Sequence, residues 1–222
     1  TRRLFQSAQS NNVKNFIYFS TIHVYGKNLV GHVTEETETF PIYPFAIAHL
    51  EAEKMINGPQ KDIATTIIRC SNTFGTPYFE NEKCWKLLVN NLCRSAFQNG
   101  KLVINSSGKD YRNFIAVDEV VRAIHHLLEL NNEVKFNRIY NLGSTDTVQI
   151  IDIAIRIQKE LKNSFDYDWP IETNKSSSVN TKEKSFMFST EKIIQTGFRP
   201  NYSGKEISSL LDYCKNKFQN EI

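Results

Sequence analysis

Glycine is scarce in this chain, and its few glycines are widely spaced. Among 222 residues there are nine, and no two stand close enough for a GxGxxG or GxxGxxG turn. Binding a dinucleotide at the start of a helix needs such a turn, because only glycine lets the backbone approach the pyrophosphate. These residues also contain neither a P-loop nor a Gly-x-Ser-x-Gly elbow, so hydrolases built on those motifs find no support.

Cysteine is scarce as well. The four cysteines show neither CxxC spacing nor a dense framework, which favours free thiols in a reducing cytoplasm over disulfides. His125 and His126 are adjacent on a predicted helix and point about 100° apart, which makes them a poor chelating pair. The sequence therefore predicts no metal site. The cysteines are Cys70, Cys84, Cys93 and Cys214.

Long apolar runs and a large excess of one charge are also absent. The 27 basic and 24 acidic residues leave a formal net charge of +3, scattered along the chain, so we expect no nucleic-acid partner. No apolar run approaches the roughly 20 residues of a membrane span, so we expect no membrane partner. With 40% hydrophobic and 23% charged residues, the composition is that of a globular protein.

Short apolar strands alternate with amphipathic helices. Residues 15–20 and 65–69 are typical of buried strands, and the helix between them, over 45–55, follows Pro44. This order predicts an α/β fold with a parallel sheet. Further strands are expected over 101–105, 113–117 and 139–142. Further helices are expected over 86–97, over 117–130 with Asp118 as N-cap, and over 148–161, 189–194 and 205–213. The serine-rich residues 174–180 predict a loop.

The amino terminus has no initiating Met and no signal-peptide pattern. Apolar positions from Leu4 to Ala8 indicate the tail of a helix. A chain that opens inside a helix is expected to be truncated.

Five segments, in order, carry a family pattern. Residues 19–26 read Phe-Ser-Thr-Ile-His-Val-Tyr-Gly, residues 69–75 read Arg-Cys-Ser-Asn-Thr-Phe-Gly, and residues 111–120 read Tyr-Arg-Asn-Phe-Ile-Ala-Val-Asp-Glu-Val. Tyr-Asn-Leu-Gly at 140–143 and Gly-Phe-Arg-Pro at 197–200 are later landmarks. Together they resemble the extended short-chain dehydrogenases/reductases of the NAD-dependent epimerase/dehydratase family, nucleotide-sugar type.

The resemblance implies a partial Rossmann-like parallel sheet with a small carboxy-terminal α/β substrate lobe. It also implies that residues 1–222 form a single truncated domain, in which the substrate lobe consists mainly of about 75–110 and 165–222. The implied cofactor is NAD or NADP, with its site incomplete in this chain because the glycine-rich turn belongs upstream. The implied protein is a cytoplasmic epimerase, dehydratase or reductase of a nucleotide-linked sugar, and a possible homodimer.

The resemblance also locates the catalytic positions. The family uses a Tyr-x-x-x-Lys pair on one helix, assisted by a hydroxyl at the preceding strand end. Here Phe45 and His49 stand at the pair, and Thr21 supplies the hydroxyl. Phe45 cannot carry a proton. His49 is left with three readings, a bond to the cofactor ribose, a base, or a helix-surface residue, and the phenols of Tyr43 and Tyr25 are packing or substrate-lining groups.

Binding positions are carried over in the same way. The resemblance places Ser20, His49, Cys70 and Ser71 at the cofactor, although Cys70 and Ser71 could equally serve packing. It places Asn72 and Arg112 at the substrate, Arg112 as a bidentate diphosphate ligand or else a structural ion pair. The family often grips the diphosphate with an arginine in the late loop, and residues 174–180 contain none.

Two hypotheses follow from these departures. The first is a diverged NAD(P)-dependent nucleotide-sugar enzyme, which Thr21, Asn72 and Arg112 favour. The second is a catalytically inactive family member that serves as a binding or partner subunit, which Phe45 favours.

Overall fold

The computed structural model of the chain describes residues 1–58, 63–79, 83–130, 138–174, 185–201 and 204–219. These form two compact units. Unit 1 comprises Thr1–Ser71, Val120–Thr145 and Phe186–Pro200. Unit 2 comprises Asn72–Glu119, Asp146–Ser185 and Asn201–Ile222.

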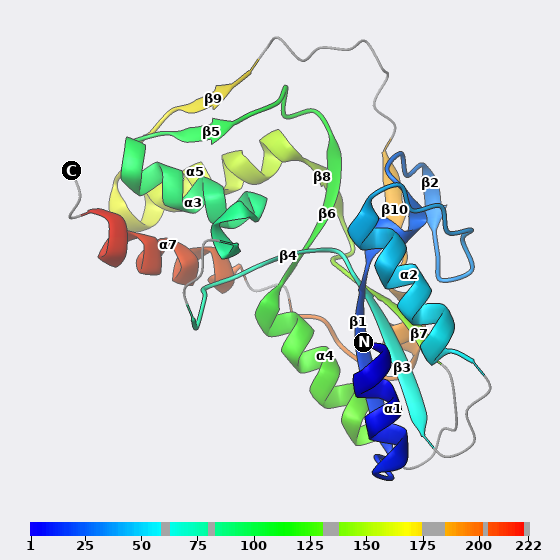
Figure 1. Ribbon diagram of the computed structural model, residues 1–222. Helices are drawn as coiled ribbons and strands as arrows, with labels where there is room; N and C mark the ends of the chain where they lie inside the picture. Colours follow the sequence, from blue (N-terminus) through cyan, green and yellow to red (C-terminus); the bar gives the residue numbers. More distant parts are fainter. Residues whose placement is uncertain (59–62, 80–82, 131–137, 175–184, 202–203, 220–222) are drawn as a thin grey trace. The chain divides into compact units, whose positions relative to one another are not determined.

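Unit 1 is built on a three-stranded parallel sheet in the order β1-β3-β7 (Figure 1). The register aligns Thr21 with Cys70 and Cys70 with Leu142, so the carboxyl ends of the strands lie level. The predicted parallel sheet is confirmed. β1 stands at the edge of this sheet among the described strands. The strands are β1 (Asn15–Thr21), β3 (Ala64–Cys70) and β7 (Arg138–Leu142).

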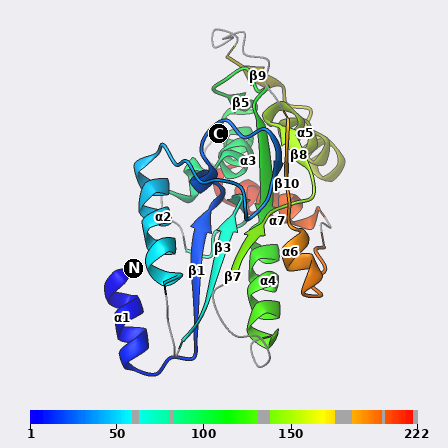
Figure 2. The ribbon, with the colours of Figure 1, turned by 90° about the vertical axis from the view of Figure 1, so that its right-hand side faces the viewer.

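Helices α1 (Arg2–Ser10) and α2 (Pro44–Ile56) cover one face of this sheet (Figure 2). Their cluster is apolar, with Phe5, Ile56 and Ile67 almost fully buried. Pro44 occupies the first turn of α2, where its missing N–H costs no helical hydrogen bond.

Helix α4 (Val117–Glu129) lies on the other side of the strands from α2 (Figure 1). The helix begins at Val117, so the prediction of Asp118 as N-cap is wrong. Asp118 and Glu119 instead lie in the first turn, where negative charge suits the helix dipole.

Several short elements of unit 1 were not predicted, because three or four residues show no periodicity. They are the 3₁₀ helix η1 (Ile22–Tyr25) and the parallel pair β2 (Gly31–Val33) and β10 (Phe186–Phe188). Helix α6 (Glu191–Gln195) matches the predicted helix over 189–194 in place.

Unit 2 packs helices around a second core. The helices are α3 (Leu88–Asn99), α5 (Ile150–Phe165) and α7 (Lys205–Phe218), with the 3₁₀ helix η2 (Cys84–Lys86). The strands are β4 (Asn72–Phe74), β6 (Tyr111–Ala116) and β8 (Thr147–Gln149) in one sheet and β5 (Leu102–Ile104) with β9 (Ile171–Thr173) in another.

The predicted helix over 148–161 starts too early. Val148 lies in β8 and pairs antiparallel with Arg112 of β6. The helix begins only at Ile150, after a capping box in which the Gln149 backbone N–H donates to Asp152 at 3.1 Å. The predicted loop over 174–180 lies, apart from Asn174, outside the described residues.

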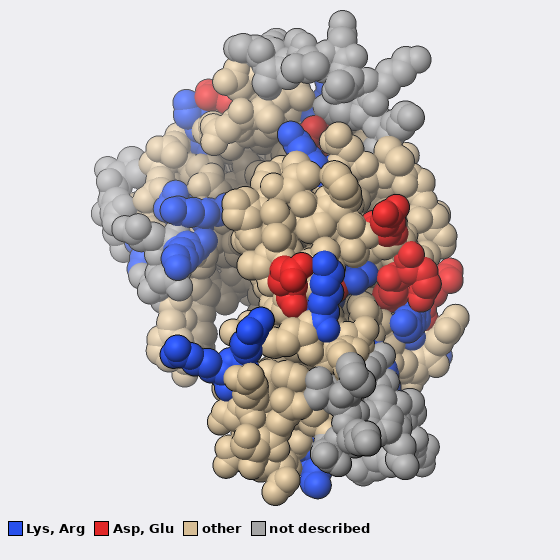
Figure 3. All heavy atoms as spheres, turned by 45° about the vertical axis from the view of Figure 1, so that its right-hand side comes forward, with Lys and Arg blue, Asp and Glu red and all other residues tan. Residues whose placement is uncertain are grey.

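All four cysteines are free thiols, as predicted. No helix in the described ranges is long and apolar enough to cross a membrane. On the face drawn in Figure 3, the Lys and Arg side chains of the described residues stand in several separate groups rather than one basic patch. Within the same ranges, no group of three or more His, Cys, Asp or Glu side chains is placed to hold a metal ion.

Candidate functional site

The end of β1 and the start of α2 bring the predicted catalytic positions into unit 1. Thr21 closes β1, and its hydroxyl accepts a hydrogen bond of 3.3 Å from the backbone N–H of His23, which caps η1. Phe45 and His49 lie one turn apart on α2, and residues spaced by four share a helix face. The Thr21 hydroxyl keeps its own proton to donate, since in this contact it only accepts.

Phe45 lies among aromatic rings. Its ring stacks on Tyr43, with centroids 5.7 Å apart and planes at 10°, and meets His23 edge-on at 5.5 Å. His23 and Tyr43 also meet edge-on, at 5.9 Å. Phe45 is 50% exposed, so this three-ring cluster reaches the surface. The titratable rings in contact with Phe45 are thus His23 and Tyr43, and His23 had not been predicted as a site residue.

His49 contacts a residue that the sequence motifs did not indicate. Its Nδ1 lies 2.9 Å from the hydroxyl of Tyr18 on β1, and the two rings are tilted at 47° with centroids 5.7 Å apart. Both side chains are half-buried. Burial raises the pKa of the Tyr18 phenol, which therefore keeps its proton.

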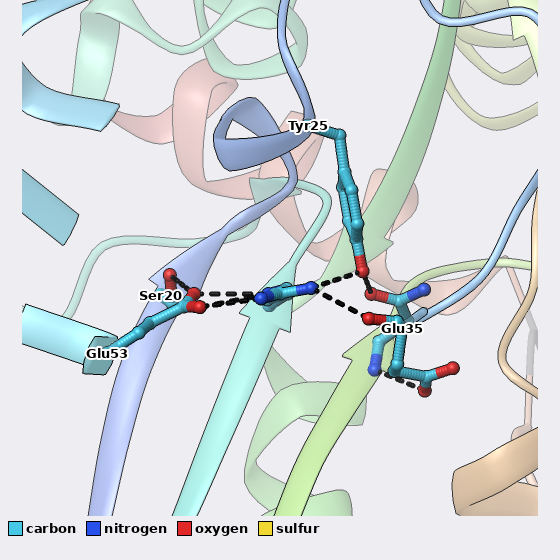
Figure 4. A network of polar contacts seen from close by, with 6 residues as sticks. Ser20, Tyr25, Glu35 and Glu53 are labelled. Atoms are coloured by element: carbon cyan, nitrogen blue, oxygen red, sulfur yellow. Dashed lines mark hydrogen bonds and ion pairs between the residues drawn. The ribbon is translucent and has the colours of Figure 1, made fainter. Parts of the chain in front are cut away.

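A buried polar network lies behind these residues (Figure 4). Arg69 on β3 donates to Glu53 of α2, with Nη2 2.7 Å from Oε2, and to the Tyr25 hydroxyl at 2.9 Å. The Ser20 hydroxyl donates to Glu53 Oε1. Ser20, a predicted cofactor residue, thus already has a partner for its hydroxyl proton.

Tyr25 links this network to β7. Its hydroxyl donates to Asn141 Oδ1 at 2.6 Å, and the Asn141 backbone N–H donates to Glu35 Oε1 at 2.7 Å. Burial raises the pKa of Tyr25 to about 12. This phenol therefore stays protonated near neutral pH and acts in packing and hydrogen bonding, one of the two roles expected for it.

Cys70 and Ser71 follow one another at the carboxyl end of β3. Both are buried, and burial raises the pKa of the Cys70 thiol to about 12, so it remains a neutral apolar group. Ser71 Oγ has no hydrogen-bond partner among the described residues. A buried hydroxyl without a partner is costly, which makes Ser71 a fitting contact for a polar ligand group.

The two predicted substrate residues belong to unit 2. Asn72 donates through Nδ2 to the backbone oxygen of Asn113 at 2.8 Å, which ties β4 to β6. Arg112 donates to the Tyr111 carbonyl at 2.8 Å and pairs with Asp110 at 3.3 Å. The Arg112 and Asp110 side chains are 36% and 46% exposed, so this is a surface ion pair of low strength that an anionic ligand can replace.

Sequence comparison finds one matching family and similar proteins that act on nucleotide sugars. A sequence model of the NAD dependent epimerase/dehydratase family matches residues 1–143. The human dTDP-D-glucose 4,6-dehydratase is 28% identical over 227 residues, covering 99% of this chain and 62% of the relative, and the bovine protein is 27% identical with 99% and 61% covered. The chain thus spans about three-fifths of the length of these relatives.

Solved structures of similar proteins show the same fold. The UDP-glucuronic acid 4-epimerase of Bacillus cereus, in complex with NAD, superposes with a TM-score of 0.78 at 20% identity, over 98% of this chain and 66% of that one. A UDP-glucose 4-epimerase gives a TM-score of 0.80 at 23% identity, over 98% and 69%.

Proposed function

Because the chain belongs to the NAD-dependent epimerase/dehydratase family, we propose that it is an NAD(P)-dependent epimerase, dehydratase or reductase of a nucleotide-linked sugar, with a degenerate catalytic pair. The observation that supports this most is the cluster at the start of α2. There, titratable rings surround Phe45, the position at which the family places its tyrosine.

The reaction requires a proton acceptor near a sugar hydroxyl, while the nicotinamide, when bound, supplies hydride exchange. Phe45 can shape the pocket but cannot take a proton. His23 and Tyr43 both contact its ring, so either can stand close to a hydroxyl that lies against Phe45. An imidazole exchanges protons readily near neutral pH, which favours His23 over a phenol.

The residues proposed at the cofactor fit a nicotinamide nucleotide in part. The unpartnered Ser71 hydroxyl offers a hydrogen bond, the neutral Cys70 thiol offers an apolar surface, and His49 offers a ring nitrogen. The pyrophosphate would need a glycine-rich turn, which these 222 residues do not contain. On the substrate side, Arg112 and Asn72 supply a cation and an amide for the nucleotide sugar.

The alternative is a catalytically inactive relative that keeps the fold as a binding or partner subunit. Phe45 favours this reading, because it removes the usual base. The three-ring cluster favours the enzyme, because it places two proton-bearing side chains at the same spot.

The test is turnover by the full-length protein with NAD or NADP and a panel of dTDP- and UDP-linked hexoses, followed by product NMR. Turnover that falls by about 10²-fold or more in His23→Gln supports the proposal, since general-base help is worth roughly 10²–10⁴ in rate. Binding of cofactor and sugar without turnover would instead support the inactive alternative.

We further propose a cytoplasmic protein, supported by four free thiols, two of them fully buried. A homodimer is proposed from exposed apolar side chains in α2 and the segment before it, including Phe40 at 74% and Ile47 at 45%. Light scattering of the full-length protein tests the dimer.

A further inference from the structure

The hydrogen bond between Tyr18 and His49 joins a strand to a helix and fixes one nitrogen of the imidazole. Tyr18 OH and His49 Nδ1 are 2.9 Å apart, although the residues are 31 positions apart in sequence. In the described part of the chain, the ring makes no hydrogen bond through Nε2. The elements that carry the two residues are held by the core of α1, α2 and the sheet. The ring is therefore anchored at Nδ1, which leaves the hydrogen-bonding capacity of Nε2 unused among the described residues.

The chemistry of the two groups decides which one donates. A neutral imidazole has one protonated and one unprotonated nitrogen, and a phenol has one proton to give. The hydroxyl group of a phenol is a good hydrogen-bond donor. Its oxygen is a poor acceptor, because its lone pair is delocalised into the ring. Burial also keeps the Tyr18 proton in place. The favoured arrangement has the Tyr18 hydroxyl donating to Nδ1, with the proton of neutral His49 on Nε2.

We propose that Tyr18 is a positioning residue that holds neutral His49 in its Nε2–H form, so that His49 donates a hydrogen bond to a ligand hydroxyl and does not act as the base. The inference rests on the proposed function. It separates two of the roles considered for His49, a hydrogen-bond donor to a hydroxyl and a base. Nε2 can accept a proton as a base only in the tautomer in which Nδ1 carries the proton. The base is then left to the cluster around Phe45, which supplies His23 and Tyr43.

The hydroxyl that receives this bond comes either from a ribose of the cofactor or from the sugar of the substrate. Both present the same chemistry to an N–H donor. Separate titrations of NAD and of a nucleotide sugar distinguish the two sources, because Tyr18→Phe should weaken only the ligand whose hydroxyl His49 contacts.

The first experiment reads the tautomer directly, with no ligand present. Nitrogen NMR of the chain with ¹⁵N-histidine, above the pH at which imidazoles are protonated, should show an unprotonated Nδ1 and a protonated Nε2 for His49. The His49→Gln variant assigns the signal among the five histidines. Tyr18→Phe should shift the Nδ1 resonance. Tyr140→Phe is the matched control, because it also removes a phenol from the sheet of unit 1 but lies on β7, two strands from Tyr18.

A protonated Nδ1, or a His49 spectrum unchanged by Tyr18→Phe in a folded variant, would overturn the proposal and leave the proposed function standing. A wild-type protein that binds neither NAD nor any nucleotide sugar would overturn the proposed function, and with it the ligand contact, whatever the NMR shows.

The second experiment separates a donor from a base in the full-length protein. A glutamine amide can replace the Nε2–H donor but cannot accept a proton, so His49→Gln should weaken binding of the contacted ligand less than His49→Leu does. His49→Leu should weaken binding of the contacted ligand roughly 3- to 10-fold, the range for one net hydrogen bond. Loss of kcat by 100-fold in both variants would identify His49 as the base and refute the donor role.

Discussion

Arg69 and Glu53 form an ion pair inside unit 1, with Arg69 Nη2 2.7 Å from Glu53 Oε2 and side chains only 5% and 3% exposed. The pair ties β3 to α2, the helix that carries Phe45 and His49. Glu53 also accepts a hydrogen bond from the Ser20 hydroxyl, and Arg69 also donates one to the Tyr25 hydroxyl. Every nitrogen of the guanidinium and both carboxylate oxygens therefore have a hydrogen-bond partner. The orientation of α2 against the sheet therefore depends on this contact.

Removing one charge of this pair should destabilise the fold strongly. Glu53→Gln leaves the Arg69 guanidinium buried without its counter-charge, at an expected cost of about 3–5 kcal/mol. The matched control is Glu51→Gln, because Glu51 pairs with Lys54 at 2.8 Å on the surface of the same helix, with both side chains more than 60% exposed. That variant should lose less than about 1 kcal/mol. Urea unfolding measures the free energy of unfolding of both variants. Equal losses would show that the buried pair contributes no more to stability than the surface pair.

Glu35 should make stability depend on pH. Burial raises the pKa of this carboxyl, against the opposing hydrogen bond from the Asn141 backbone N–H. The folded protein thus holds the proton more tightly than the unfolded chain, where a glutamate titrates near about 4.3. The contribution to stability is present below that pH and is lost as the pH rises through the raised folded value.

Glu35→Gln cannot ionise and keeps a carbonyl oxygen for the Asn141 N–H. Its stability relative to the parent should therefore increase as the pH rises from about 4 towards 7. Melting temperatures across this range test the effect. Glu38→Gln, in which an exposed glutamate of the same segment is changed, should follow the parent. A difference between Glu35→Gln and the parent that falls with rising pH would contradict the assigned direction.

The 222-residue chain alone should bind NAD(H) and NADP(H) very weakly. A glycine-rich turn that cradles the pyrophosphate is not among its residues, and the cofactor contacts proposed for Ser71, Cys70 and His49 do not replace it. Titration calorimetry of this chain should show no saturation at micromolar cofactor. Micromolar affinity would mean that other residues of the chain bind the phosphates.

Arg112 should contribute to nucleotide-sugar binding in the full-length protein. Its partner Asp110 is half-exposed, so a diphosphate can replace that contact and gain a charge-assisted bond. Arg112→Ala should weaken binding by about 1–3 kcal/mol. Lys109→Ala removes a nearby exposed cation as a control and should have little effect. Unchanged binding in Arg112→Ala would assign Arg112 to the structural pair with Asp110.

The sequence predicted the large elements well, because β1, α2 and β3 are long enough to show periodicity and carry buried apolar residues. It did not reveal β2 or β8, since three-residue strands depend on a distant partner. Val148 illustrates this, because its apolar side chain suits α5 until its pairing with Arg112 is known.

For the candidate site, motif order predicted which elements carry the residues. Thr21, Phe45 and His49 do lie on β1 and α2, yet the motifs contain no information about contacts such as Tyr18 with His49 or His23 with Phe45. A signal for the buried pair was available in the sequence. Arg69 follows Ile67 and Ile68 near the end of an apolar strand, and Glu53 lies on an amphipathic helix. Charged residues are seldom fully buried unless they are paired.

The pair of positions 45 and 49 offers the most direct test of whether the site is still built for family chemistry. Replacing Phe45 by Tyr and His49 by Lys in the full-length protein restores a phenol and an ammonium one turn apart on α2. Both changes are needed, because the ammonium lowers the pKa of the phenol. Phe45 is 50% exposed, so a tyrosine at this position need not be buried completely.

The double variant should gain roughly 100-fold in turnover of a bound nucleotide sugar, within the 10²–10⁴ that a general base supplies. The single variants Phe45→Tyr and His49→Lys are the controls, and each should gain much less. No gain, with cofactor and sugar nucleotide both bound, would favour the inactive subunit. A parent protein that already turns over as fast as the double variant would show that Phe45 does not disable the chemistry, and that a side chain of the ring cluster, His23 before Tyr43, carries the proton instead.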